Sequence, residues 1–167
     1  MSKLSYILIT LILGLLLAIG VTLYIKNKPT LVIENKVTYT DSSVILPSTT
    51  GSPVEVTNFL KDPAVIADAQ NPGLYFVGNT FLKGSDNSVP TYVVTYEEKN
   101  GYFNIALLVK PLARARFDAE KYLENFLNID ENSLCSLSYT VSVPGYVDEA
   151  ASGIDYRFSF CPDNVPL

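Results

Sequence analysis

Residues 91–127 read TYVVTYEEKNGYFNIALLVKPLARARFDAEKYLENFL, and this stretch decides the fold. Apolar and polar residues alternate over 91–98 and again over 102–109, on either side of Asn100-Gly101. That pair favours a two-residue type I′ turn, so the pattern predicts an antiparallel β-hairpin. With such a turn Tyr92 faces Val109 and Tyr96 faces Ile105, and these residues belong to one apolar face.

The second half of this stretch predicts a helix over residues 111–127, because Pro111 suits a first helical turn. Arg114, Asp118 and Lys121 fall on its polar side, and Phe117 lies off the apolar side, where we expect it to be exposed. The apolar residues recur at helical spacing on the opposite side: Leu112, Ala115, Ala119, Tyr122, Leu123, Phe126 and Leu127.

Further elements are expected on both sides of this stretch. Upstream, Asp62 is a suitable N-cap for a short helix over Pro63–Ala69, and residues 74–77 (LYFV) predict a strand. Downstream, alternation predicts strands over Cys135–Val143 and Ile154–Phe160. The predicted fold class is therefore α+β, with an antiparallel sheet packed against one long helix.

The run Leu4–Ile25 (LSYILITLILGLLLAIGVTLYI) contains no charged residue. As a helix with a rise of about 1.5 Å per residue it would be roughly 33 Å long, enough to cross the hydrocarbon core of a bilayer. The alternative is a cleaved signal peptide with a small-x-small site at Ala18-Ile19-Gly20. Because apolar residues continue past Gly20, we expect an N-terminal transmembrane helix that is retained.

These features divide the chain into an anchor (1–28), a stalk or linker (29–57) and an α+β domain (58–167). The stalk holds an edge strand within Thr30–Thr40 and the linker-like PSTTGSP of residues 47–53. Lysines lie on both sides of the span, but a short N-terminal tail before it and a long domain after it are typical of exported domains. We expect a single-pass protein of the cell membrane, with lipid around residues 4–25 and an extracytoplasmic C-terminal domain.

The charge and composition restrict what this domain can bind or catalyse. All 17 acidic residues lie after residue 29, against nine Lys and Arg, a formal charge near −8 that argues against nucleic acid as a partner. The chain contains no His, so Ser-His and Cys-His nucleophile pairs are excluded. A Ser-Lys dyad stays open. The adjacent carboxylates are expected to be solvated turn acids: Glu97 and Glu98, Asp130 and Glu131, Asp148 and Glu149.

We expect no cofactor and no metal site. Asn128, Asp130 and Asn132 have the spacing that begins an EF-hand loop. However, the sixth position is Ser133 and the twelfth is Tyr139, where the motif requires Gly and Glu. Asp130 is better interpreted as the cap of a short turn. Since the chain has neither His nor a CxxC pattern, a zinc site is not expected either.

Cys135 and Cys161 are the two cysteines of the chain. In an exported domain a pair predicts a disulfide, and the alternative is two buried free thiols. Cys135 lies on the apolar parity of its expected strand and Cys161 on the polar parity of its own. A bond between them therefore requires a bulge, or strand ends that leave the ladder.

Several motifs after residue 62 resemble a protein family: FNIALL, PLARAR, LCSLSYTVSVP and the terminal SFCP. The family consists of single-span membrane-anchored proteins of small-genome candidate-phylum (Patescibacteria-like) bacteria, for which no activity is known. Its usual ending has Gly after the Cys-Pro, where this chain has Asp163. The resemblance implies an extracytoplasmic domain with two paired cysteines.

These inferences together predict a non-enzymatic binding or assembly protein of the bacterial cell envelope, with an envelope protein of unknown identity as its partner. The alternative is a pilin-like subunit of a pilus or secretion apparatus, since such proteins also combine an apolar N-terminal helix, an α+β head and a C-terminal disulfide. The acidic residue that pilins carry early in the helix is missing from residues 4–25. A hydrolase is the third and least favoured class.

Overall fold

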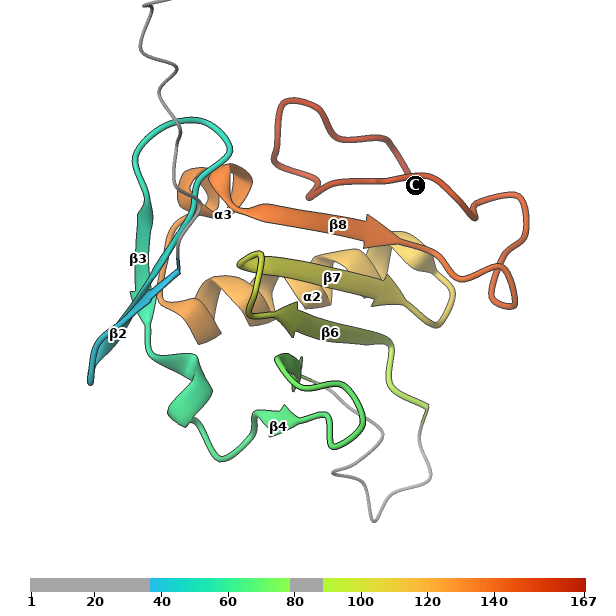
Figure 1. Ribbon diagram of the computed structural model, residues 1–167. Coiled ribbons are helices and arrows are strands. Elements are labelled where there is room, and N and C mark those ends of the chain that lie inside the picture. Colours follow the sequence, from blue (N-terminus) through green and yellow to red (C-terminus); the bar gives the residue numbers. More distant parts are fainter. Residues whose placement is uncertain (1–36, 79–88) are drawn as a thin grey trace, which may run out of the picture. The chain divides into compact units, whose positions relative to one another are not determined.

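The computed structural model describes residues 37–78 and 89–167, which form two sheets, a long helix and shorter helical segments (Figure 1). The fold class is α+β, as predicted. In chain order the described elements are β1 (Thr38–Tyr39), β2 (Ser43–Leu46), β3 (Val54–Thr57), the 3-10 helix η1 (Phe59–Lys61), β4 (Ile66–Ala67), β5 (Leu74–Val77), β6 (Tyr92–Glu97), β7 (Tyr102–Leu107), α2 (Leu112–Leu127), α3 (Glu131–Ser136) and β8 (Ser138–Ser142).

The larger sheet has five strands in the order β4-β5-β6-β7-β8. The pairs β4–β5, β5–β6 and β6–β7 are antiparallel, whereas the pair β7–β8 is parallel. The expectation of a purely antiparallel sheet is therefore wrong at this edge. The reason is the connection: α2 and α3 intervene between β7 and β8, so the chain crosses back over the sheet and re-enters it in the same direction.

The predicted hairpin is formed by β6 and β7, but its register differs from the expected one by two residues. Tyr92 pairs with Leu107 rather than with Val109. The loop is a turn closed by the Gly101 N–H, which donates to the Glu98 carbonyl (3.3 Å). A type I′ turn needs positive φ at both central residues, and in this loop only Gly101 (φ 61°) has it. Because the shift is an even number, the apolar face is nevertheless the predicted one.

Helix α2 confirms the prediction for residues 111–127 and covers one face of β6 and β7 (Figure 1). Phe117 is 46% exposed, as expected. The helix ends where Asn128 adopts a left-handed conformation (φ 55°). The buried side also holds two charged residues that the apolar pattern does not include, Arg116 and Glu120.

The segment expected as a stalk contributes, from residue 37 on, to the same compact unit as the rest of the described chain. Strands β1, β2 and β3 form an antiparallel sheet whose Val44, Leu46 and Val56 are at most 2% exposed and belong to the core. The loop after β2 lies against the β6–β7 turn, so a Cβ on Gly101 would be 2.8 Å from Pro47 Cδ. The N-terminal part of the expected strand lies outside the described residues.

The short helix expected over Pro63–Ala69 is not formed. Instead η1 precedes this segment and β4 (Ile66–Ala67) lies within it. The Asp62 carboxylate does bind a following backbone N–H, that of Ala64 (2.7 Å), but it closes a turn rather than capping a helix. Asp-Pro is a turn signal as well as a helix-start signal, and the paired strand β5 favours the extended conformation here.

The two C-terminal strand predictions were partly wrong. The strand expected over Cys135–Val143 begins only at Ser138, because α3 occupies the residues before it. Residues 154–160 form no strand, although they lie along the outer edge of β8 (Figure 1). Arg157 has a left-handed conformation (φ 56°), which an extended ladder does not accommodate. We call residues 154–165 the C-terminal segment.

Within residues 37–78 and 89–167, no helix has the length and apolar character needed to cross a membrane. The span predicted at residues 4–25 lies outside the described residues.

Candidate functional site

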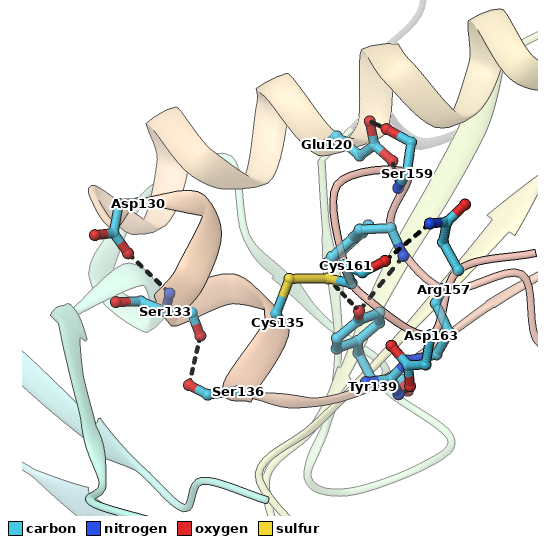
Figure 2. The surroundings of a disulfide bond; sticks show 12 residues. Glu120, Asp130, Ser133, Cys135, Ser136, Tyr139, Arg157, Ser159, Cys161 and Asp163 are labelled. Atoms are coloured by element: carbon cyan, nitrogen blue, oxygen red, sulfur yellow. Dashed lines mark hydrogen bonds and ion pairs between the residues drawn. A yellow bond between two sulfur atoms is a disulfide. The ribbon is translucent and has the colours of Figure 1, made fainter. Parts of the chain in front are cut away.

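The predicted disulfide between Cys135 and Cys161 is present, with the two Cα atoms 5.6 Å apart. It joins α3 to the C-terminal segment (Figure 2). The conflict between strand faces does not arise, because Cys135 lies on a helix and Cys161 on a turn. The bond therefore ties together two parts of the chain that the β-ladder does not connect.

Asp130 is the N-cap of α3, the helix that holds Cys135, as the interpretation of that residue as a cap predicted. The Asp130 carboxylate accepts the backbone N–H of Ser133 (2.8 Å). Hydrogen bonds from Ser133, its hydroxyl first and its backbone N–H second, lower the pKa of Asp130. In the described ranges, no group of three or more Cys, Asp or Glu side chains is placed to hold a metal ion.

An open cavity of about 610 Å³ lies beside this bond, and we call it the disulfide cleft. Three parts of the chain form it: the loop after β2, helix α3 and the C-terminal segment. The loop is held against α3 by the Thr49 N–H and hydroxyl, which both donate to the Ser136 carbonyl (2.8 and 3.0 Å). The residues that line the cleft are Thr49, Thr50, Asn132, Cys135, Ser136, Arg157, Phe160, Pro162 and Asp163.

Arg157 is the cation of the disulfide cleft. Its Nε lies 3.2 Å from Asp163 Oδ2 in an ion pair without hydrogen-bond geometry. Its guanidinium carbon lies 4.2 Å from the centroid of the Tyr139 ring, a cation–π contact. Another guanidinium nitrogen donates to the Tyr139 carbonyl (3.3 Å). Because the cation is paired with a carboxylate, the cleft has a donor and an acceptor side by side and little net charge.

The C-terminal segment satisfies the outer edge of β8. The Tyr156 N–H donates to the Val141 carbonyl (2.8 Å), and the Asp155 carboxylate accepts the Val141 N–H (3.0 Å). A side chain thus takes the place that a backbone carbonyl would have in a further strand. The hydrogen-bonding groups of Val141 at the sheet edge are therefore paired although the described part of the chain has no further β-strand there, and the residues that follow are held beside the cleft.

A buried charge pair on α2, the helix that covers one face of the sheet, fixes the same segment. Glu120, 2% exposed, accepts the Ser159 N–H (2.5 Å) and the Ser159 hydroxyl (2.8 Å) (Figure 2). Arg116 lies 3.7 Å from Glu120 and donates to the Val165 carbonyl (2.8 Å). Both charges therefore have partners in the interior, which makes the position of the C-terminal segment specific.

One carboxylate of each adjacent pair considered from the sequence has a partner elsewhere in the structure. Glu98 accepts the Tyr75 hydroxyl (3.1 Å), Asp130 caps α3, and Asp148 pairs with Lys110 (2.7 Å). These three carboxylates therefore have structural roles. The sequence reasoning located the two cysteines of the site but missed Tyr139 and Arg157, since alternation shows only which face a residue occupies.

Comparison of the chain with protein-family models, curated proteins and solved structures found no match. The function is therefore inferred from the residues of the disulfide cleft and from the sequence.

Proposed function

We propose that the protein is anchored in the bacterial cell membrane by residues 4–25, exposes its C-terminal domain outside the cytoplasm, and acts there by binding another component of the cell envelope without catalysis. The observation that carries this proposal is the Cys135–Cys161 disulfide. Structural disulfides persist in oxidising compartments and are rare where thiols are kept reduced. The uncharged run at residues 4–25 supports the same placement.

The disulfide cleft is the part of the domain best suited to binding. Three chain segments meet there, and each is fixed by contacts of its own: hydrogen bonds from Thr49, the cap at Asp130 and the buried Glu120. A rigid cleft loses little conformational entropy when a ligand binds. Nothing in its lining resembles a nucleophile activated by a base, so binding rather than catalysis is the function that we propose.

The anchoring can be tested on membranes from cells that produce the full chain. We expect the protein to stay in the membrane fraction after carbonate and high-salt washing. N-terminal sequencing that begins at Val21 would refute a retained helix and indicate a cleaved signal peptide instead.

The binding role requires a second experiment. A photo-crosslinking residue at Asn132, exposed at the cleft, is compared with one at Gln70, exposed in the connection between β4 and β5 at the opposite edge of the larger sheet. We expect a crosslinked product that is specific to position 132 in native membranes. Identical products from both positions, or none from either, would contradict a binding role for the cleft.

The alternative, a pilin-like subunit, is favoured by the order of an apolar run, an α+β domain and a C-terminal disulfide. It predicts a different result in the same experiment: the product at position 132 would be a ladder of copies of this chain. An envelope component of another kind would exclude this alternative.

A further inference from the structure

The two sulfur atoms of the disulfide lie in different surroundings. Cys161 is 1% exposed, whereas Cys135 is partly exposed and lines the disulfide cleft. A thiol that enters the cleft from solvent therefore reaches Cys135 and not Cys161. Thiol–disulfide exchange depends on which sulfur is accessible and on how well the other sulfur leaves.

The buried sulfur has a hydrogen-bond donor beside it. The Tyr139 hydroxyl oxygen lies 3.1 Å from Cys161 Sγ (Figure 2). Because a disulfide sulfur carries no hydrogen, the hydroxyl is the donor in this pair. Burial raises the pKa of Tyr139, against the opposing effects of the Phe158 N–H and of Arg157, so its proton stays in place at neutral pH. The Phe158 N–H donates to the same oxygen (3.4 Å), which helps to orient the hydroxyl.

We propose that the disulfide cleft admits an external thiolate to Cys135 Sγ, where it forms a mixed disulfide, and that Tyr139 stabilises the departing Cys161 thiolate by a hydrogen bond. This inference requires only the disulfide itself and holds whatever else the protein binds.

The step is balanced as follows. The thiolate sulfur forms a bond to Cys135 Sγ, the Sγ–Sγ bond breaks, and its electron pair stays on Cys161. A second external thiol then attacks the mixed disulfide and leaves Cys135 reduced, while the two external thiols become the oxidised disulfide. An apolar interior disfavours a thiolate, and the Tyr139 donor offsets that cost. The position of the Tyr139 hydroxyl beside Cys161 Sγ favours the Cys161 thiolate as the leaving group, because a better-stabilised thiolate leaves faster.

The attacking thiolate has two sources, a small thiol or the exposed cysteine of a thiol–disulfide oxidoreductase. The probes are glutathione and a thioredoxin without its resolving cysteine, each added to the oxidised full-length protein in detergent. Free thiols are alkylated at short times, and peptide mapping shows which cysteine carries the probe. We expect the probe on Cys135 and the alkyl group on Cys161, in about tenfold excess over the reverse.

The faster of the two probes identifies the source of the thiolate. Equal modification of both cysteines, or a probe on Cys161, would overturn the proposal. So would a disulfide that neither probe opens under native conditions although it opens in denaturant.

The role of Tyr139 is tested by Tyr139→Phe, which removes the donor and keeps the ring. We expect exchange at Cys135 to be slower by roughly 10- to 100-fold, the factor for loss of one hydrogen bond to a charged group. A variant that only destabilises the fold would instead exchange faster and lose the preference for Cys135. The matched control is Tyr156→Phe, whose hydroxyl donates to the Ala151 carbonyl (3.1 Å), away from the disulfide. Equal slowing in both variants would overturn the role of Tyr139.

Discussion

Replacing Glu120 by alanine is expected to destabilise the domain far more than replacing a partly exposed glutamate of the same helix. The Glu120 carboxylate accepts two hydrogen bonds from Ser159 and lies 3.7 Å from Arg116. Without it, the Ser159 N–H loses its acceptor. The Arg116 cation, 7% exposed, then keeps only backbone carbonyls as partners.

The magnitude follows from these contacts. Two hydrogen bonds to a charged acceptor contribute about 1.5–3 kcal/mol each, and breaking a buried ion pair from one side costs about 3–5 kcal/mol. The two figures describe overlapping contacts, so we expect a loss of about 3–5 kcal/mol in the free energy of unfolding. Domains of this size have about 5–15 kcal/mol in total.

The assay is urea denaturation of residues 35–167 with the disulfide intact, followed by near-ultraviolet circular dichroism. With a slope of about 2 kcal/mol per molar urea, the midpoint should fall by about 2 M. The matched control is Glu124→Ala, which breaks a partly exposed ion pair with Lys121 (2.6 Å) and should cost less than about 1 kcal/mol. Equal shifts of the urea midpoint in the two variants would refute the conclusion that the buried charge pair holds the C-terminal segment in place.

Three further outcomes can be measured in the same way. Leu123→Asp puts a charge on a residue that is 1% exposed and should cost several kcal/mol, whereas Lys121→Asp should change stability little; similar effects would mean that the wrong face of α2 is buried. Gly101→Ala should cost about 1–2 kcal/mol or more, because φ is 61° and the new Cβ would be 2.8 Å from Pro47; an unchanged midpoint would argue against this turn. Hydrogen bonds from Ser133 lower the pKa of Asp130, so this carboxylate stabilises the fold above its unfolded pKa of about 3.9. That contribution disappears as pH falls through the lower folded pKa. Asp130→Asn keeps a capping oxygen but does not titrate, so on acidification from about pH 5 to below the folded pKa it should lose less stability than the parent chain.

The hairpin, the long helix and the cysteine pair could be predicted because each depends on information within a short stretch or on a unique choice. Alternation around Asn100-Gly101 selects the buried face even when the turn type is mistaken, since Tyr92 and Tyr96 keep their parity after a shift of two residues. The pair formed by Cys135 and Cys161 needed no geometry, because the chain has two cysteines.

The errors share a physical cause, which is that distant contacts overrode a local pattern. Residues 154–160 alternate as a strand does, yet Asp155 binds the edge of β8 with its side chain and Arg157 turns the backbone away from the ladder. The burial of Glu120 was not predicted at all, because its partner Ser159 lies 39 positions further along the chain. No window around either residue contains that information.

The buried contacts of the C-terminal segment have a consequence for folding during synthesis. Tyr156 and Phe158 belong to the core, at most 5% exposed, and Arg116 on α2 donates to the carbonyls of Tyr156 and Val165. The β6–β7 hairpin and α2 leave the ribosome long before these residues do, so the domain cannot close during synthesis of its first two thirds. A chain released early would expose the edge of β8 and a cysteine without a partner. Closure of the core and oxidation of the cysteine pair therefore follow the synthesis of residues 156–165.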